Sequence, residues 1–227
     1  MPASFRAIAT TEPTGVSSFN CAKPTGTAQD DIMLACAAVG LATAAAVGTP
    51  TGGATWTLLD SLDGGSGSLH TKIWWKVAGG SEPANYAFTM DSSSLASVAV
   101  LAIQGAGSNT PLHANSTAGS GVNVSTPTLT PNAADDLEVR IAGASDFIDT
   151  ISWTPPSTYT QRANLGLMGV ATKALSSGSA TGALNYVADT TPTVRHGFTI
   201  DIATLVVAIP RHPPVMSTAA VHRASNW

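Results

Sequence analysis

The chain has 227 residues, of which 44% are hydrophobic and only 11% are charged, against about 25% charged residues in an average soluble domain. This composition can form a hydrophobic core, and it excludes an intrinsically disordered chain, which needs high charge and few apolar residues. The net charge is −4 and the ten Lys and Arg residues are scattered. Phosphate contacts need clustered basic residues, so these features argue against a general nucleic-acid binder.

Short segments of alternating polar and apolar residues, separated by Gly, Ser, Thr and Pro, predict strands and turns rather than helices. In chain order, the clearest segments are 55–58, 72–77, 85–90 and 198–202. The Ala-rich piece 41–47 is compatible with a short helical turn. The longer run 32–48 contains two glycines and falls short of the roughly 20 strongly apolar residues of a bilayer helix, so we expect no membrane association.

Segments of the first half recur in the same order in the second half, at offsets of about 100 to 106 residues. Examples are Asp30-Asp31 with Asp135-Asp136, Trp56 with Tyr159, and Asn85-Tyr86 with Asn185-Tyr186. Chance similarity between Ala-, Ser- and Thr-rich segments is the alternative to duplication. A few isolated strands cannot bury their apolar face, so we expect the halves, about 16–105 and 122–209, to form one domain over residues 1–210. The predicted fold is all-β, an antiparallel β-sandwich of jelly-roll type.

The last expected strand ends at three prolines, Pro210, Pro213 and Pro214, because proline cannot donate a ladder hydrogen bond. Residues 211–227 are therefore predicted to form an extended C-terminal arm. Arg211 and the terminal Trp227 are the candidates in this arm for docking into a neighbouring molecule. A disordered terminus is the alternative.

Four motifs follow one another along the first half. They are Asp30-Asp31-Ile32-Met33-Leu34-Ala35, then Pro50-Thr51-Gly52 with Thr55-Trp56-Thr57-Leu58-Leu59, then Trp74-Trp75-Lys76-Val77-Ala78, and Glu82-Pro83-Ala84-Asn85-Tyr86-Ala87-Phe88-Thr89. In this order they resemble a β-sandwich domain of bacterial genomes and tailed bacteriophages, often actinobacterial, that is grouped with minor tail and other virion proteins. The chain departs from that pattern at Asp30, at Ala54-Thr55 and at Trp74-Trp75, where the family has glycines and a tyrosine pair. The resemblance implies an architecture and a setting, and it transfers no catalytic residue.

The sequence contains no complete catalytic motif. Residues 64–68 lack the last glycine of a GxSxG elbow, and Gly105-Ala106-Gly107 lacks the third glycine of a dinucleotide loop. Cys21 and Cys36 lack the spacing of a zinc site, and we expect both to be reduced and packed, with a disulfide as the alternative. We therefore expect no enzymatic activity, no cofactor and no metal site, the alternative being an Asp–His site assembled only in the folded chain.

Acidic pairs occur at several turns. Asp60 and Asp63 offer too few ligands for a calcium loop of the EF-hand type. The pairs 30–31 and 135–136 each precede an expected strand, where Asp favours turns through its own side-chain hydrogen bonds. Turn formation is the favoured interpretation, and a surface calcium site or a pair of carboxylates for glycoside hydrolysis are the alternatives.

Aromatic residues are the remaining functional candidates. Because side chains alternate between the two faces of a strand, Trp75 is expected in the core, while Trp74 shares the opposite face with Lys72 and Lys76. Such a face is typical of a partner surface or a sugar-stacking platform, and burial of Trp74 under a loop or second layer is the alternative. Trp56 and Tyr159 recur in both halves and are expected to be core anchors.

These observations predict a non-enzymatic structural component of a tailed-bacteriophage virion, either a minor tail or a head-decoration protein. Its expected partners are other virion proteins and further copies of itself, with no nucleic acid and no membrane. Residues 1–13 contain no basic stretch followed by an apolar core, so no signal peptide is expected and assembly would occur in the host cytoplasm. The alternative is a carbohydrate-binding module that contacts a cell-surface glycan.

Overall fold

The computed structural model describes residues 1–40, 47–64, 69–145 and 151–205, and these residues form strands and connecting turns without a helix. The strands are β1 (Ser4–Thr11), β2 (Thr14–Ala22), β3 (Ile32–Gly40), β4 (Thr57–Asp63), β5 (Leu69–Val77), β6 (Asn85–Gln104), β7 (Leu112–Ser116), β8 (Asn123–Thr126), β9 (Leu137–Ser145), β10 (Trp153–Thr154), β11 (Thr160–Leu165), β12 (Met168–Ala174), β13 (Leu184–Ala188) and β14 (Val194–Ile202).

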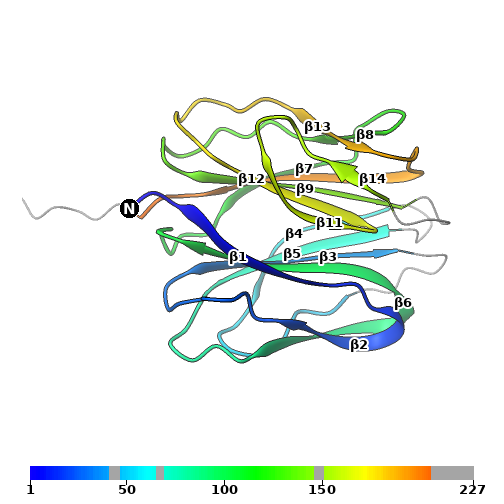
Figure 1. The fold of residues 1–227 in the computed structure, drawn as a ribbon, viewed down its shortest axis with the longest axis horizontal. Helices are drawn as coiled ribbons and strands as arrows, with labels where there is room; N and C mark the ends of the chain where they lie inside the picture. Colours follow the sequence, from blue (N-terminus) through cyan, green and yellow to red (C-terminus); the bar gives the residue numbers. More distant parts are fainter. Residues whose placement is uncertain (41–46, 65–68, 146–150, 206–227) are drawn as a thin grey trace, which may run out of the picture.

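Two antiparallel sheets pack face to face in the middle of the molecule (Figure 1). The first has the order β1-β6-β3-β5-β4, and the second has the order β11-β12-β9-β14-β7. A third sheet, β10-β13-β8, lies over the second, and β2 pairs with the beginning of β6 on the opposite side of the molecule. The predicted all-β fold of packed antiparallel sheets is confirmed.

The strand pairing follows the same pattern in the two halves of the chain. In the first half β3 pairs with β5 and β6, and in the second half β9 pairs with β12 and β14. Each half continues outward in the same way, from β5 to β4 and from β12 to β11. In the first half, the 20-residue β6 corresponds to both β13 and β14 of the second half. Its beginning pairs with β2 as β13 pairs with β8, and its end pairs with β3 as β14 pairs with β9.

Every residue of β3 and β9 is buried. One face of each strand contributes to the central core between the two main sheets, where Leu34 and Leu101 of the first half meet Ile141 and Phe198 of the second. The opposite faces are covered by separate apolar clusters, one under β2 and the start of β6 and one under β8, β10 and β13. Strands buried on both faces have nearly continuous apolar sequences, which explains why 32–40 lacks alternation.

Polar contacts connect the two main sheets. The carboxylate of Glu12 accepts hydrogen bonds from the Gly166 amide at 2.6 Å and from the Ser97 hydroxyl at 3.1 Å. In the central core, Nδ1 of His196 lies 2.9 Å from the hydroxyl of Thr71. Burial lowers the pKa of His196 to about 4, so its imidazole is neutral at physiological pH and adds no charge to the core.

Gly197 sets how closely β8 approaches β14. A Cβ atom at this position would lie 2.0 Å from the backbone oxygen of Ser125, so any other side chain would push the third sheet away from the second. Gly107 is a matched comparison, because a Cβ there would meet its nearest atom, the backbone oxygen of Thr204, at an ordinary 3.7 Å.

We expect Gly197→Ala to lower the free energy of unfolding by about 1 to 3 kcal/mol, since overpacking of a filled interior forces the backbone to move. The control Gly107→Ala is expected to stay within about 0.5 kcal/mol of the parent chain. Chemical denaturation monitored by tryptophan fluorescence measures both. Equal stability of the two variants would show that β8 is not held against β14 at this point.

Candidate functional site

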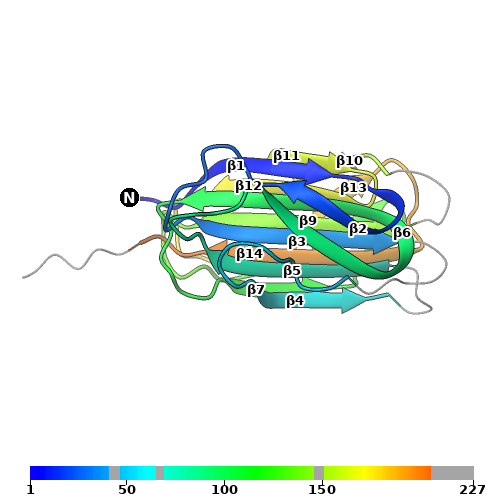
Figure 2. The same ribbon diagram turned by 90° about the horizontal axis from the view of Figure 1, so that it is seen from below.

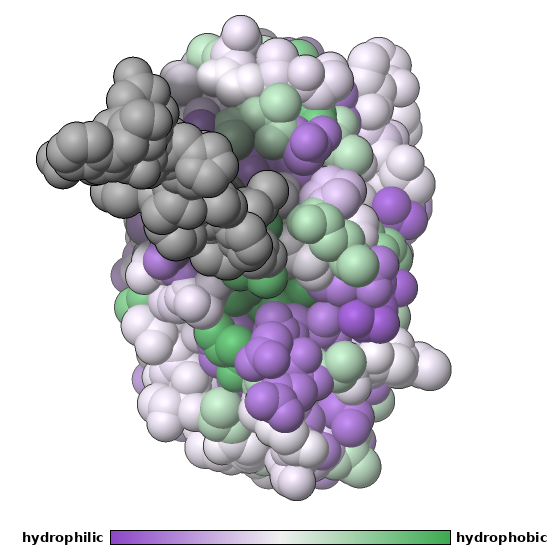
Figure 3. Space-filling model, turned by 90° about the vertical axis from the view of Figure 1, so that its left-hand side faces the viewer, coloured by the Kyte–Doolittle hydropathy of each residue, from purple (hydrophilic) through white to green (hydrophobic). Residues whose placement is uncertain are grey.

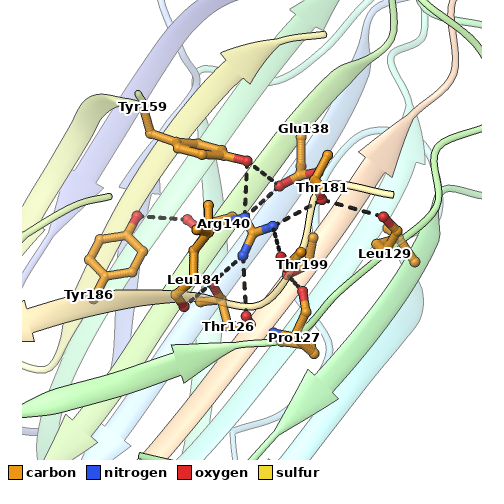
Figure 4. Close-up of polar contacts among 11 residues, drawn as sticks. Thr126, Pro127, Leu129, Glu138, Arg140, Tyr159, Thr181, Leu184, Tyr186 and Thr199 are labelled. Atoms are coloured by element: carbon orange, nitrogen blue, oxygen red, sulfur yellow. Dashed lines mark hydrogen bonds and ion pairs between the residues drawn. The ribbon is translucent and has the colours of Figure 1, made fainter. Parts of the chain in front are cut away.

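Arg140 lies in the middle of β9, on the face that turns toward the third sheet, and is fully buried. Each nitrogen of its guanidinium finds an oxygen (Figure 4). Its hydrogen bonds run from Nε to Glu138 at 2.5 Å, from Nη1 to the Thr126 hydroxyl at 2.7 Å, and from Nη2 to the Thr181 hydroxyl at 3.0 Å and the Gly182 carbonyl at 2.8 Å. A buried charge is costly unless it is paired and hydrogen-bonded, and here both conditions are met.

Two tyrosines complete this cluster (Figure 4). The hydroxyl of Tyr159 donates to Glu138 at 2.5 Å, and the hydroxyl of Tyr186 donates to the backbone oxygen of Arg140 at 2.9 Å. Burial and the hydrogen bond to Glu138 raise the pKa of Tyr159 above its usual 10, so its hydroxyl remains a donor. The cluster thereby fastens β8, the segment before β13 and the turn before β11 to β9.

The first half contains a comparable cluster built from different residues. Nζ of Lys76 bonds to Glu82 at 2.5 Å and lies 4.5 Å from the ring centre of Trp56 and 4.4 Å from that of Tyr86. The Tyr86 hydroxyl also donates to Glu82, at 2.9 Å. Burial lowers the pKa of Lys76, and the neighbouring Glu82 opposes this effect. Each half therefore ties its outer layer to its main sheet through a buried ion pair and aromatic rings.

The surface predicted at Trp74, Lys72 and Lys76 is wrong. The three side chains do share one face of β5, but Trp74 is only 1% exposed and Lys76 only 3% exposed. Trp74 packs edge-on against Phe88 of β6, with ring centres 6.4 Å apart, and Lys72 donates to the backbone oxygen of Val47. The alternative of a covering second layer is confirmed. The prediction failed because alternation along one strand separates its two faces but does not reveal whether both faces are covered.

The predicted docking residues Arg211 and Trp227 lie outside the described residues, as does most of the piece 41–47 in which a helical turn was expected. Trp56 and Tyr159 are buried, which confirms both as core anchors. Trp75 is only partly buried, although it packs against the central core as expected.

The paired aspartates form equivalent turns in the two halves. Asp30 and Asp135 have positive φ angles of 68° and 70°, a conformation that Asp tolerates better than most residues. The next residue in each pair accepts a backbone hydrogen bond, Asp31 from Ala28 at 2.9 Å and Asp136 from residue 133 at 2.8 Å. The turn interpretation of these pairs is confirmed.

Both cysteines are free and buried, as expected, with Cys36 in the central core and Cys21 in the cluster under β2. Burial raises the pKa of the Cys21 thiol to about 11 and raises that of Cys36 as well. A thiol reacts as its thiolate, so burial keeps both side chains unreactive at neutral pH.

Carboxylate and imidazole groups gather where the edge strands β4 and β7 lie side by side (Figure 2). His70 contacts Asp63, and Asp60 accepts a hydrogen bond from Asn115 at 2.9 Å with His113 at 3.9 Å. Within the described ranges, no group of three or more His, Cys, Asp and Glu side chains is placed to hold a metal ion. The contacts of Asp60 with Asn115 and His113 join the edges of the two main sheets, whereas the contact of His70 with Asp63 lies within the first sheet.

Asp201, near the end of β14, is a buried acid without a basic partner among the residues described. One oxygen accepts hydrogen bonds from the backbone and side-chain nitrogens of Asn132, at 3.2 and 3.3 Å. Burial, together with the nearby carboxylates of Asp136 and Glu138, raises the pKa of Asp201 to about 6. Its ionised form at neutral pH therefore costs stability.

A groove of about 460 Å³ opens along the side of the molecule where β1 and β11, the edges of the two main sheets, meet. The lining residues are Ser4, Phe5, Leu137, Thr158, Thr160, Arg162, Thr172, Lys173 and Ala174. No motif of the sequence pointed to Arg162 or Lys173. The one sequence feature that could have indicated them is Tyr159, which precedes β11. Arg162 lies on β11 and Lys173 on β12, the strand that pairs with it.

At the end of the molecule where β1 begins, a smaller cavity of about 280 Å³ is lined by Asp30, Val77, Ala106, Ser108 and Leu205. Figure 3 views this end and shows an apolar patch near its centre with hydrophilic residues beside it.

No protein-family profile matches the chain, and no curated protein matches it. The resemblance to virion proteins therefore depends on the sequence motifs alone. In the part of the chain that the structure covers, no helix has the length and apolar character needed to cross a bilayer.

Replacement of Arg140 tests the tie between β9 and the third sheet. We expect Arg140→Met to lower the free energy of unfolding by about 3 to 5 kcal/mol, because Glu138 is left buried without its cation. The double variant Arg140→Met/Glu138→Gln should lose less. Arg195→Met removes a cation whose only hydrogen bond among the described residues is to the backbone oxygen of Gly121, and this variant should stay within about 1 kcal/mol. Urea titrations that gave equal losses for Arg140→Met and Arg195→Met would refute the tie.

Asp201→Asn tests the cost of the buried acid through its pH dependence. The folded-state pKa of about 6 exceeds the usual 3.8, so this group favours folding below about pH 4 and loses that contribution as the pH rises to 6. We expect the variant to be more stable than the parent by about 1 to 3 kcal/mol above pH 7 and equally stable below pH 4. Unfolding measured from pH 3.5 to 8 checks this, with the exposed Asp91→Asn as the control expected to show no such difference.

Proposed function

We propose that the chain is a structural component of a tailed-bacteriophage virion, a minor tail or head-decoration protein that acts through protein–protein packing and has no enzymatic activity. The observation that carries the proposal is the pair of internal ties, Lys76 with Glu82 and Arg140 with Glu138. They hold an outer layer on each side of a doubled sandwich and so produce one thick, rigid body. Rigidity of this kind suits a protein whose contacts with neighbours must keep their geometry.

The low charge of the chain supports the same proposal. Only 11% of the residues are charged, and several of these side chains are engaged inside the molecule. A surface filled mainly by Ser, Thr and Asn packs against neighbours at a small desolvation cost, since few charges must be removed from water. The motif resemblance to virion sandwich domains supports this setting.

The neighbouring edge strands β4 and β7 form the surface that we assign to packing. Leu58 on β4 is 50% exposed and Leu112 on β7 is 39% exposed, and the two strands lie side by side (Figure 2). Unpaired edge strands offer backbone hydrogen-bonding groups to a neighbour. We therefore infer contacts with further copies of the chain or with other virion proteins at this edge.

The glycan-binding alternative loses the feature that motivated it. Its platform was the face of Trp74, which is buried under β6 and β2. No second function is therefore proposed for that face.

Complementation of virus particles tests the proposal. Particles made from the encoding genome, with this reading frame deleted and supplied in trans, are purified on a density gradient and quantified by peptide mass spectrometry. We expect several copies of the parent chain per particle and at least a tenfold reduction for Leu58→Asp, because a charge opposes burial at the packing edge.

Val16→Asp is the matched control, since Val16 is 37% exposed on β2, away from the β4 and β7 edges. It should be incorporated like the parent chain, and both variants should match the parent in thermal unfolding. Absence of the parent chain from purified particles would contradict the proposed function. Equal incorporation of the two Asp variants would contradict the assignment of the packing edge.

A further inference from the structure

Most basic side chains in the described part of the chain are bonded to other groups. Eight of the ten Lys and Arg residues lie in the described part of the chain. Six of these bond to a carboxylate or a backbone oxygen: Arg6, Lys23, Lys72, Lys76, Arg140 and Arg195. The two others, Arg162 and Lys173, form neither kind of bond with the residues described, and both line the groove between β1 and β11.

Arg162 is held in place by contacts that leave part of its guanidinium available. Its guanidinium carbon lies 3.9 Å from the ring centre of Phe5, and its Nε donates to the Thr172 hydroxyl at 2.8 Å. Neither Nη group has a hydrogen-bond partner among the described residues. Arginine positioned in this way presents a planar fork that matches the oxygens of a carboxylate or phosphate.

Lys173 adds a second positive charge to the groove. Its Nζ lies 5.4 Å from the ring centre of Tyr159. Glu138 is its cross-strand neighbour on β9, but that carboxylate is buried and bonded to Arg140 and Tyr159. No acidic residue is among the described residues that line the groove, so this is a positive site on a chain whose net charge is −4.

Hydroxyl groups surround the two cations. Ser4, Thr158, Thr160 and Thr172 all line the groove. The side chains of Thr158 and Thr160 have no hydrogen-bond partner within the described ranges, and both residues are exposed. The volume of about 460 Å³ falls within the usual range of small-molecule sites, about 300 to 1,000 Å³.

A phosphate monoester fits this arrangement best, because its charge of about −1.5 to −2 at neutral pH balances two cations, whereas a carboxylate balances one. The free threonine hydroxyls match a hydroxylated body attached to the phosphate. We propose that the groove binds a phosphorylated sugar, with the phosphate held by Arg162 and Lys173 and the sugar hydroxyls held by Thr158 and Thr160. This site is separate from the packing edge at β4 and β7.

Isothermal titration calorimetry on the full chain tests the proposal with four probes: glucose 6-phosphate, inorganic phosphate, glucuronate and glucose. We expect glucose 6-phosphate to bind at least fivefold more tightly than phosphate or glucuronate, and glucose to show no binding. Added salt should weaken the binding, because the contact is between charges. Failure of glucose 6-phosphate to bind, equal binding of phosphate, or equal binding of glucose would each overturn the proposal.

Variants locate the site. Arg162→Gln should weaken glucose 6-phosphate binding at least tenfold, Arg162→Lys less, and Lys173→Gln several-fold. Thr158→Val should weaken binding of the sugar phosphate without changing that of inorganic phosphate. Arg195→Gln, which removes the same charge at the opposite end of the β9–β14 ladder, is the matched control and should bind like the parent. Parent-like binding by both Arg162 variants and Lys173→Gln, with thermal unfolding unchanged, would place the ligand elsewhere and overturn the proposal.

Discussion

The structure depends on the burial of β3 and β9 on both faces. A sheet whose central strand is covered on one side only can leave polar residues on the other side, but these two strands have neighbours above and below (Figure 1). Each main sheet therefore needs an outer layer as well as its partner sheet. Each half of the chain supplies one main sheet and the strands that cover it, which are β2 with the start of β6 in the first half and β8, β10 and β13 in the second.

The two copies meet this requirement with different chemistry. In β3 the outward face is wholly apolar, and the cation comes from the neighbouring strand at Lys76. In β9 the corresponding face carries Glu138 and Arg140. The covering segments provide oxygens that accept hydrogen bonds from Arg140, and Glu138 accepts from Arg140 and from the hydroxyl of Tyr159. Removal of one partner from a buried pair costs more than the pair contributes, so such residues are tightly coupled to the layer that covers them.

The sequence predicts much of this fold and little of the site. Asp31 and Asp136, and likewise Tyr86 and Tyr186, occupy corresponding positions in the two halves. The Asp turns follow from local side-chain hydrogen bonds. The prediction that Trp74 is exposed is wrong because alternation is a property of a single strand. Whether a strand face is buried depends on other strands that are distant in the chain. The groove at Arg162 was invisible for the same reason, since it forms only where the edges of two sheets meet.

The continuity of β6 makes the two outer layers mechanically unequal. In the first half, one unbroken strand runs from the cover into the main sheet and turns at the end of the molecule (Figure 2). In the second half, residues 189–193 separate β13 from β14. Opening of the first cover is thus coupled to its main sheet through a continuous strand. The second cover is held to its main sheet by side-chain bonds such as those of Arg140, so we expect the two covers to exchange amide hydrogens at different rates.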